Sequence, residues 1–429
     1  MKPSSDKKTS VFLDRDLSHV EAQRRGENVG RKERIDRKDW KCIKVGEFEL
    51  HRNNTCSRSL MTSDNGKIQN IHYGDILVKF NEIVSLEQTK IDYLTSDGED
   101  CAPKDYIQNG DIVIADTAED ETVGKMIEVQ DVGQHKVVAG LHTIFYRPPS
   151  NLFARGWLGY WMNSTAYHSQ LNQYMTGIKV LSLSKSCLAN TLIQYPPKKE
   201  QQQIVAALDS VQRHITSLQA LVAKYDAVKK ATVKLLLEPK EGWQRLQIKD
   251  FAQVYDGTHQ TPHYTKSGIP FFSVENVTTN VFPGDKRISL REHRKLTAKF
   301  KIRRGDVLMT RIGSIGECRL VDWDYDSSFY VSLAALRFKP NLVLPEYFVT
   351  YSTSRNFQEE VNIHSLPFAV PQKINLGPIS DIYVSAPPLN EQRKIAARIS
   401  AIDDALKDCR AQLAKAKSLK QGMMSYFFG

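Results

Sequence analysis

YPPKKEQQQI, at residues 195–204, is followed 191 positions later by APPLNEQRKI, at residues 386–395. After each opening, apolar residues recur at alternating intervals of four and three positions. This pattern is a heptad seam, which is typical of helices that pack as a coiled coil. Two seams with the same spacing, each after the same P-P-x-x-E-Q opening, indicate an internal repeat. The two series are Ile204, Leu208, Val211, Ile215, Leu218, Val222 and Tyr225, and Ile395, Ile399, Ile402, Leu406, Cys409, Leu413 and Ala416.

The repeated segments predict two long helices. Proline is tolerated at a helix start because it lacks an N–H, and an acidic residue in the first turn favours the positive end of the helix dipole. The first helix is expected over residues 199–237, before Pro239, and the second over residues 390–421, before Gly422. A helix of about 38 residues is on the order of 57 Å long. Because one apolar stripe does not stabilise such a helix alone, we expect the two to pair as an antiparallel coiled coil.

A fainter repeat precedes each helix. Residues 40–48, WKCIKVGEF, align with residues 243–251, WQRLQIKDF. Residues 109–114, NGDIVI, align with residues 304–309, RGDVLM. A Gly-Asp pair followed by apolar residues predicts a strand that is entered through a turn. The repeat therefore includes a lobe of short strands before each helix.

These features predict a mixed α/β fold with a pseudo-two-fold internal repeat, in which two similar lobes are separated by two long antiparallel helices. Within the lobes, helical stretches are expected at residues 153–174 and 345–361. The N-terminal arm is charged, lacks apolar periodicity and is expected to be flexible. The expected boundaries are 1–39 for the arm, 40–197 for the first lobe, 198–237 for the first helix, 238–388 for the second lobe and 389–429 for the second helix.

The composition indicates a globular protein without secretion signals. Of its 429 residues, 41% are hydrophobic and 25% are charged, and the length suits two domains. The N-terminus is charged rather than signal-like, and the longest uncharged run, residues 156–178, holds too many polar residues for a membrane span. The scattered cysteines fit a reducing cytosol, so we expect a cytoplasmic protein with no membrane contact. The six cysteines are not arranged in any C-x-x-C pair. They are Cys42, Cys56, Cys101, Cys187, Cys318 and Cys409.

The net charge of +10 is unevenly distributed along the chain. Residues 198–237 and 389–429, the two expected helices, carry +4 each, whereas the first lobe carries −4 and the second +3. A basic helix face is more often a solvated surface than a binding site. The total charge therefore does not by itself indicate a nucleic-acid partner.

The doubled layout resembles the specificity subunits of Type I restriction–modification systems of bacteria and archaea. Residues 257–262, GTHQTP, followed by residues 268–277, GIPFFSVENV, are typical of their target-recognition domains. The resemblance spans roughly residues 40–429 and leaves out residues 1–39. It implies that each lobe reads one half of a bipartite, asymmetric site in double-stranded DNA, and that the helices set the spacer between the halves.

The resemblance also implies partners. The helices would dock two methyltransferase subunits, and two restriction subunits would complete the enzyme. No cofactor is expected in this chain, because S-adenosylmethionine would belong to the methyltransferase partner and ATP with Mg²⁺ to the restriction partner.

The sequence lacks the motifs of a catalytic subunit. It contains no G-x-x-x-x-G-K-[ST] phosphate loop, and residues 194–198, QYPPK, lack both ends of the N/D-P-P-Y/F tetrad of adenine methyltransferases. His259 and His263 have no third ligand at zinc spacing. The acidic run at residues 119–121, near Lys125, is more simply an exposed loop than a nuclease centre. We therefore expect neither a catalytic nor a metal site.

The second lobe offers the clearest candidates for DNA contact. Its loop at residues 258–264 is polar, is bounded by Gly257, and occupies the position of the family's recognition loop; such loops place polar and basic groups against base edges. Residues 286–304 hold the densest basic cluster, which predicts phosphate contacts, the alternative being a solvated helix near residues 290–298. The candidates are Thr258, His259, Gln260, Tyr264, Lys286, Arg287, Arg291, Arg294, Lys295, Arg303 and Arg304, with Arg311 and Ser314 as secondary candidates.

The first lobe, with its negative charge, gives a weaker pattern. Arg58, Lys79 and Asn81 are its candidates for DNA contact, and each has an alternative as an ordinary surface residue.

Two other functions are consistent with parts of the pattern. A nuclease within one lobe predicts that the pure chain cleaves DNA in the presence of Mg²⁺. A stand-alone repressor that dimerises through the helices predicts a stable homodimer. The duplicated seam argues against the repressor, because one chain already contains both strands of a coiled coil.

Overall fold

The computed structural model describes residues 37–95, 102–177 and 179–429. The chain divides into two compact units. Unit 1 holds the described residues up to Thr216 together with Ala414–Gly429, and unit 2 holds Ser217–Leu413. Apart from its last three residues, the predicted flexible arm lies outside the described residues, and so does Cys101.

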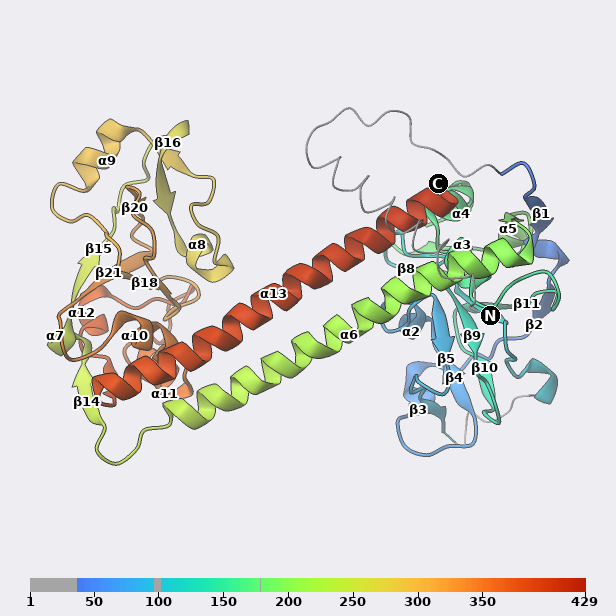
Figure 1. The fold of residues 1–429 in the computed structure, drawn as a ribbon, viewed down its shortest axis with the longest axis horizontal. Helices are drawn as coiled ribbons and strands as arrows, with labels where there is room; N and C mark the ends of the chain where they lie inside the picture. The colour runs from blue at the N-terminus through green and yellow to red at the C-terminus, as the bar shows by residue number, and fades with distance from the viewer. Residues whose placement is uncertain (1–36, 96–101, 178) are drawn as a thin grey trace, which may run out of the picture. The chain divides into compact units, whose positions relative to one another are not determined.

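Two helices of 40 residues each run from one unit into the other (Figure 1): α6 (Lys198–Leu237) and α13 (Leu389–Phe428). The first follows the prediction to within one residue. The second continues through Gly422, so its predicted end before this glycine is wrong. The reason is the last turn, where Phe427 and Phe428 are buried. Their burial outweighs the roughly 1 kcal/mol that a glycine costs inside a helix.

The two helices are antiparallel. In unit 2, Arg410 of α13 donates to Asp226 of α6 at 2.9 Å, and Lys229 of α6 pairs with Asp403 of α13 at 2.5 Å. Residue numbers therefore fall along one helix as they rise along the other. This arrangement confirms the predicted fold class of two lobes with long paired helices.

Unit 1 continues the pairing, because the ammonium group of Lys420 donates to the Gln212 amide oxygen at 2.7 Å. None of the predicted seam residues is exposed. Val222, Tyr225, Ile402 and Leu413 are half-buried. The others are buried: Ile204, Leu208, Val211, Ile215, Leu218, Ile395, Ile399, Leu406, Cys409 and Ala416.

The lobe of unit 1 is built on a five-stranded sheet in the order β2-β11-β7-β9-β5. A four-stranded sheet, β10-β4-β6-β3, and two strand pairs, β1-β13 and β12-β8, complete it. The strands are β1 (Lys41–Lys44), β2 (Glu49–His51), β3 (Met61–Thr62), β4 (Gln69–Ile71), β5 (Ile83–Ser85), β6 (Tyr93–Leu94), β7 (Ile112–Ala115), β8 (Thr117–Ala118), β9 (Met126–Gln130), β10 (Val137–Ala139), β11 (Thr143–Arg147), β12 (Leu181–Ser182) and β13 (Leu192–Tyr195). The α-helices are α2 (Tyr73–Val78), α3 (Trp157–Trp161), α4 (Thr165–Leu171) and α5 (Lys185–Ala189).

The lobe of unit 2 repeats this plan on a four-stranded sheet, β15-β21-β18-β19. A three-stranded sheet, β17-β16-β20, and the pair β14-β22 accompany it. The strands are β14 (Gln244–Gln247), β15 (Ala252–Asp256), β16 (Tyr264–Phe272), β17 (Arg287–Ile288), β18 (Val307–Thr310), β19 (Cys318–Leu320), β20 (Ser328–Phe329), β21 (Leu333–Phe338) and β22 (Tyr383–Ala386). The α-helices are α7 (Ile248–Phe251), α8 (Val274–Thr279), α9 (Leu290–Leu296), α10 (Pro345–Tyr351), α11 (Arg355–Ile363) and α12 (Leu376–Ile379).

The two Gly-Asp turns have the same structure, and each leads into the predicted strand, β7 or β18. In unit 1 the carboxylate of Asp111 accepts two hydrogen bonds from Arg147, at 2.9 and 2.7 Å. In unit 2, Asp306 accepts the same two bonds from Arg337, at 2.9 and 2.7 Å. Each aspartate is buried and also accepts from a backbone N–H three positions earlier. The sequence repeat is therefore also a repeat of buried ion pairs.

The openings of the long helices match in the same detail. The side chain of Gln201 is fully buried, accepts from the Ala154 N–H at 2.8 Å and donates to the Pro196 carbonyl at 2.9 Å. Gln392 is likewise fully buried and makes the corresponding bonds to Leu344 and Pro387, each at 2.8 Å. The glutamine of the repeated P-P-x-x-E-Q opening thus ties the first turn of each long helix to its own lobe.

Each predicted helical stretch within the lobes is two short helices. In unit 1, α3 ends before Ser164, whose hydroxyl accepts from the N–H of Tyr167 and starts α4. In unit 2, Ser354 separates α10 from α11 through the same cap on Phe357. A serine N-cap satisfies the free N–H groups of a helix start and so permits a change of direction.

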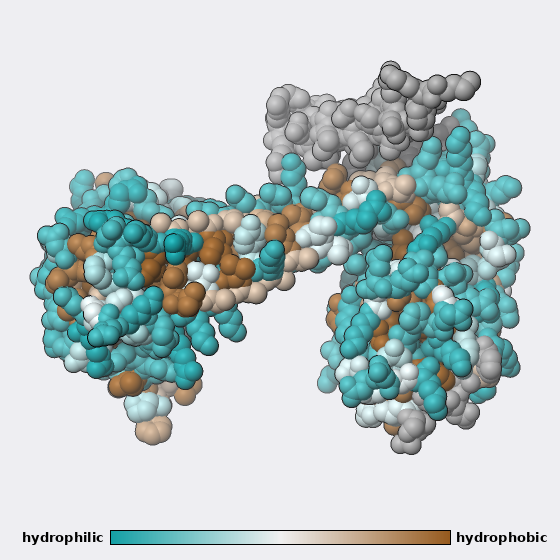
Figure 2. Space-filling view, turned by 60° about the horizontal axis from the view of Figure 1, so that its bottom comes forward, coloured by the Kyte–Doolittle hydropathy of each residue, from teal (hydrophilic) through white to brown (hydrophobic). Residues whose placement is uncertain are grey.

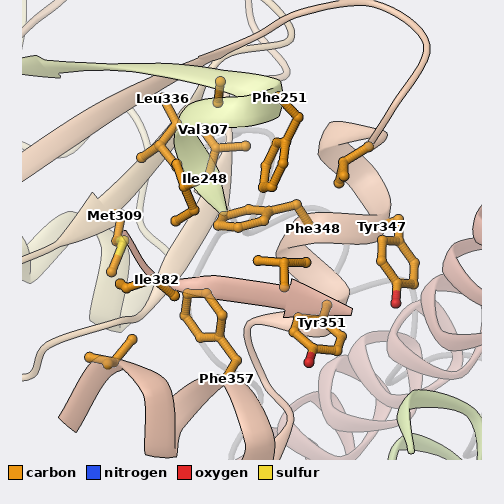
Figure 3. Close-up of a cluster of buried hydrophobic side chains, with 14 of the residues drawn as sticks. Ile248, Phe251, Val307, Met309, Leu336, Tyr347, Phe348, Tyr351, Phe357 and Ile382 are labelled. Carbon is orange, nitrogen blue, oxygen red and sulfur yellow. The ribbon is translucent and has the colours of Figure 1, made fainter. Parts of the chain in front are cut away.

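The core of unit 2 joins the sheet to these short helices (Figure 3). Phe251, Phe348 and Phe357 point into one cluster with Val307 and Met309 of β18. The same buried cluster includes Leu237, Ile395 and Ile399 of the long helices. The lobe and the beginning of α13 therefore share one core.

The end of α13 packs against the lobe of unit 1. The ring of Phe428 is fully buried and meets Trp157 and Trp161 edge-on, with ring centroids 5.4 and 5.5 Å away. Arg37 donates to the carbonyl oxygen of Gly429 at 2.9 Å. Aromatic side chains therefore anchor this helix end on the lobe that precedes α6.

The face of the molecule drawn in Figure 2 is mostly hydrophilic over both lobes, and hydrophobic surface follows the helices. Within the described ranges, no helix combines the length and the apolar character needed to cross a membrane.

Candidate nucleic-acid interface

One edge of the main sheet of unit 2 gathers segments that are far apart in the sequence. β15 and β18 are both antiparallel to β21, so they run parallel to each other. Their last residues, Asp256 and Thr310, both pair near the start of β21. The chain leaves this edge as loop 257–263 and as loop 311–316. We refer to this side as the loop edge of unit 2.

Arg311 holds these segments together from inside. Its guanidinium donates to the carbonyl oxygens of Val331 and Ile374, at 2.8 and 3.4 Å, and to the carboxylate of Asp256 at 3.0 Å. The residue is buried. A buried guanidinium needs such partners, because an unpaired buried charge is costly. Arg311, a predicted DNA contact, therefore lies beneath the loops with its guanidinium bound to protein acceptors, and not on the exposed surface.

The base of loop 257–263 is fixed by backbone contacts. The Thr258 N–H donates to the Phe329 carbonyl at 3.1 Å, and its carbonyl accepts from the Val331 N–H at 2.9 Å. A Cβ on Gly257 would lie 2.5 Å from the carbonyl of Tyr330. Glycine at position 257 therefore permits this close approach of the two backbones. The predicted candidate Thr258 is half-buried and belongs to the base of the loop.

The tip of the same loop presents polar groups to solvent. The His259 ring nitrogen Nε2 lies 2.7 Å from the carboxylate of Asp256, which Arg311 holds from the other side. His259, Gln260 and Tyr264 are all exposed. The buried Arg311 therefore positions the exposed His259 ring through Asp256. Imidazole and amide groups can donate hydrogen bonds to base edges and accept them.

Helix α9 carries basic residues on the face opposite its buried side. Ser289 caps the helix by accepting from the Glu292 N–H at 3.1 Å, and the buried His293 ring contacts the Ser328 hydroxyl at 2.9 Å. Burial lowers the pKa of His293. The exposed side chains of this helix include Arg291, Arg294 and Lys295.

The predicted basic cluster divides according to its partners. Lys286 and Arg304 each pair with a carboxylate, at 3.4 and 2.6 Å, and the half-buried Arg287 donates to a backbone carbonyl at 2.6 Å. Lys301 also pairs with a carboxylate, that of Asp326, at 2.5 Å. The remaining members have no carboxylate within 4 Å among the residues that the structure describes. We call these exposed side chains the unpaired cations of unit 2: Arg291, Arg294, Lys295, Lys299 and Arg303.

Ser314, the remaining candidate of this lobe, is exposed on loop 311–316. The structure thus brings it to the same edge as His259 and Gln260. The backbone N–H of Ile374 donates to the Arg311 carbonyl at 3.0 Å, so a third segment meets these loops.

In unit 1 the two basic candidates neutralise a buried acid. The carboxylate of Asp75 accepts from Arg58 at 2.8 Å and from Lys79 at 3.1 Å, and Asp92 lies 3.7 and 3.8 Å from the same two cations. Burial would raise the pKa of Asp75, but the hydrogen bonds from Arg58 and Lys79 outweigh it and hold the pKa below its ordinary value. These cations therefore have a structural role that the sequence did not indicate, while Asn81 is exposed.

The loop edge of unit 1 holds polar residues that the sequence candidates omit. β2 and β7 are both antiparallel to β11, so they end at one edge, as β15 and β18 do. There His142 lies 3.6 Å from Asp116, and the Tyr73 ring meets the His142 ring edge-on. Both loop edges thus carry an aspartate–histidine pair. No local pattern reveals this one, because only the pairing of β7 with β11 brings Asp116 and His142 together.

The residues considered for a nuclease or metal centre do not assemble. Asp120 of the acidic run accepts from Thr122 and forms a local turn. The ammonium group of Lys125 donates to the carbonyl oxygens of Leu77 and Phe80 instead, at 3.0 and 3.1 Å. In the described part of the chain, no three histidine, cysteine, aspartate or glutamate side chains lie close enough to hold a metal ion.

Comparisons with known proteins agree with this architecture. The family model of the Type I restriction modification DNA specificity domain matches residues 37–224 and again residues 240–415. The chain is 21% identical over 304 residues to the Type I restriction enzyme EcoBI specificity subunit of Escherichia coli, and 25% identical over 198 residues to the putative type I restriction enzyme MjaX specificity subunit of Methanocaldococcus jannaschii.

These two alignments cover 61% and 44% of this chain, and the chain spans 63% and 46% of the length of these two relatives. A solved structure, that of the Type-I restriction-modification system S subunit from M. genitalium, has a similar fold, with a TM-score of 0.61 at 13% identity over 93% of this chain and 98% of that one. The family match falls once on each lobe and covers most of the sequence. The chain therefore belongs to the family of Type I restriction–modification DNA specificity proteins.

Proposed function

We propose that the chain is the sequence-specific DNA-recognition and scaffold subunit of a Type I restriction–modification enzyme. Each lobe reads one half of a bipartite, asymmetric site in double-stranded DNA. The helices set the spacer between the halves and dock two methyltransferase subunits, and two restriction subunits complete the enzyme. The chain itself is not catalytic. S-adenosylmethionine binds to the methyltransferase partner, and ATP with Mg²⁺ binds to the restriction partner.

The observation that carries this proposal is the combination of surfaces on unit 2. The unpaired cations provide phosphate contacts, which give affinity without sequence information. The tip of loop 257–263 adds exposed imidazole and amide groups on a base that is fixed by Arg311. Such groups discriminate base pairs in the major groove when their position is fixed. Two different surfaces of one lobe thus supply affinity and specificity: the unpaired cations and the tip of loop 257–263.

The difference between the lobes supports a bipartite, asymmetric site. Both lobes have corresponding main sheets, β2-β11-β7-β9-β5 and β15-β21-β18-β19, and the same kind of buried ion pair, Asp111–Arg147 or Asp306–Arg337. Their loop edges carry different residues, and the two lobes as a whole have net charges of opposite sign. A common framework with different edges is suited to reading two different half-sites.

An exposed stripe on α6 supports docking of a protein partner. Leu221, Val228 and Leu235 are spaced by seven residues, are all exposed, and lie outside the seam of this helix. A heptad stripe outside the seam offers a second helical packing surface. We assign this stripe to the methyltransferase subunit.

The proposed function is tested by transferring specificity. The chain is co-expressed with its cognate methyltransferase in a host that lacks adenine methylation, and the methylome is sequenced. We expect methylation at one two-part sequence, and none when the chain is expressed alone. Methylation of the same sequence after an unrelated specificity subunit has replaced this chain would contradict the proposal. The native mass of the purified complex gives the number of methyltransferase subunits.

The unpaired cations lead to a prediction about salt dependence. Replacing Arg291, Arg294 and Lys295 together with alanine should reduce the slope of log Kd against log salt concentration by about 2–3, because each lost phosphate contact removes about 0.9. The preferred sequence should not change, because phosphate contacts carry no base information. The measurement is a fluorescence anisotropy titration of target duplex at several salt concentrations.

The matched control for this prediction replaces the paired cations Lys286 and Arg304 with alanine. Their charges are already compensated by carboxylates, so the slope should change by less than about one. Equal slopes for the triple variant and the unmodified chain would exclude α9 from the interface.

A further inference from the structure

The large apolar side chains with the highest exposure among the described residues lie on one loop of unit 2. Phe368 is 96% exposed and Val370 is 97% exposed. Single exposed apolar residues are ordinary, but two neighbouring side chains of this size, both almost fully in water, mark a contact surface. We call residues 366–370, LPFAV, the apolar tip.

A backbone hydrogen bond and two prolines define the shape of the apolar tip. The Leu366 N–H donates to the Lys373 carbonyl at 2.8 Å and closes the loop at its base. The prolines Pro367 and Pro371 limit the backbone freedom of the residues between them. This geometry holds the two apolar side chains outward, almost fully exposed. Because they bury so little surface against the described part of the chain, that part of the fold does not require them to be apolar.

The loop of the apolar tip is continuous with the loop edge of unit 2. The Gly313 N–H, in loop 311–316, donates to the Gln372 carbonyl at 2.8 Å. Ile374 follows the apolar tip in the sequence, and its carbonyl accepts from Arg311 at 3.4 Å. Arg311 also donates to Asp256 at 3.0 Å. The same arginine therefore positions both the His259 loop and the segment that carries the apolar tip.

We propose that the apolar tip is a third DNA-contacting element of unit 2, which inserts Phe368 and Val370 into a groove of the double-stranded target. This inference rests on the proposed function and names further residues for it. Apolar side chains contact the methyl group of thymine in the major groove, or enter between base steps as wedges. Residues 365–372 contain no charged side chain, so the tip meets no repulsion from the phosphates.

DNA is favoured over a protein partner by the position of the tip. The tip shares its supports with the polar loop that presents His259, and loops at one sheet edge approach one ligand surface together. The exposed stripe on α6, in contrast, has the heptad spacing that helical partners recognise. The methyltransferase surface and the apolar tip are therefore assigned to different elements.

The test compares DNA affinity with assembly. The chain is purified with its methyltransferase subunits as the wild type, as Phe368→Ser with Val370→Ser, and as Leu342→Ser. Leu342 is also exposed, but it follows the opposite end of β21. We expect the double variant to bind the target duplex at least about tenfold more weakly than the wild type does. The Leu342→Ser variant should bind this duplex as the wild type does.

The expected loss should vanish on a duplex in which the half-site read by unit 2 is scrambled. Three outcomes would overturn the inference: unchanged affinity of the double variant, an equal loss for Leu342→Ser, or loss of methyltransferase subunits from the double variant in the absence of DNA, which would make the tip a protein interface. If the wild-type complex itself does not prefer its target over an unrelated duplex, the proposed function fails rather than this inference alone.

Discussion

Replacing Phe428 with alanine is expected to lower the free energy of unfolding of unit 1 by about 3–5 kcal/mol. The ring is fully buried, with the Trp157 and Trp161 rings edge-on to it. Truncation removes apolar burial, leaves a cavity between two indoles, and loses edge-to-face contacts that contribute about 0.5–1.5 kcal/mol each. The end of α13 should then detach from the lobe more often.

Hydrogen exchange can locate this effect. Exchange of the amide groups of α3 in unit 1 should accelerate, whereas the amide groups of α10 in unit 2 should exchange as in the unmodified chain. Met424→Ala is the matched control, because Met424 lies one turn earlier on α13 and is only half-buried. A loss of stability no larger than that of Met424→Ala, or equal acceleration in both units, would contradict the role of Phe428 as an anchor.

The long helices could be predicted because their signal is local. The heptad intervals after residues 195–204 and 386–395 specify both the helices and their seam. The missed end of α13 shows the limit of such signals. Gly422 is unfavourable in a helix, but the burial of Phe427 and Phe428 depends on a lobe that lies more than 250 residues earlier in the sequence.

The loop edges could not be predicted, because they are products of sheet topology. Asp116 and His142 become neighbours only through the pairing of β7 with β11. The sequence also does not distinguish an exposed arginine from a buried one. Arg311 directly follows a strand, and it points inward because Asp256, Val331 and Ile374 offer acceptors there.

Charge was predicted better as a cluster than residue by residue. The basic segment at residues 286–304 does supply exposed cations, but it also contains Lys286 and Arg304, which are compensated by carboxylates. In unit 1, Arg58 and Lys79 compensate the buried Asp75. The apolar tip shows the opposite case, because the apolar residues of SLPFAVP do not reveal from the sequence whether they are buried or exposed.

Replacing Arg311 with alanine should lower both the stability of unit 2 and its contribution to DNA recognition. Removing one partner of a buried ion pair costs about 3–5 kcal/mol, and the partial exposure of Asp256 places the expected loss near the lower end. The loops that carry His259 and the apolar tip would lose their common support. We expect Kd for the target duplex to rise about 100-fold, a loss comparable to one or two base contacts.

Two variants separate support from simple loss of charge. Arg311→Lys keeps the charge, but an ammonium group cannot reproduce the planar fork that reaches Asp256, Val331 and Ile374 together, so most of the loss should remain. Arg355→Ala removes an arginine that is 90% exposed and should change stability by less than about 0.5 kcal/mol.

The decisive measurement is discrimination at each half-site. Binding is measured on duplexes in which one half-site or the other is scrambled, at a temperature where the Arg311→Ala variant is folded. If Arg311 positions the reading loops, this variant should lose its preference at the half-site of unit 2 and keep it at the half-site of unit 1. A destabilised variant that still discriminates at both half-sites would show that the loops above Arg311 do not read the bases, and the recognition surface of unit 2 would then have to lie on α9.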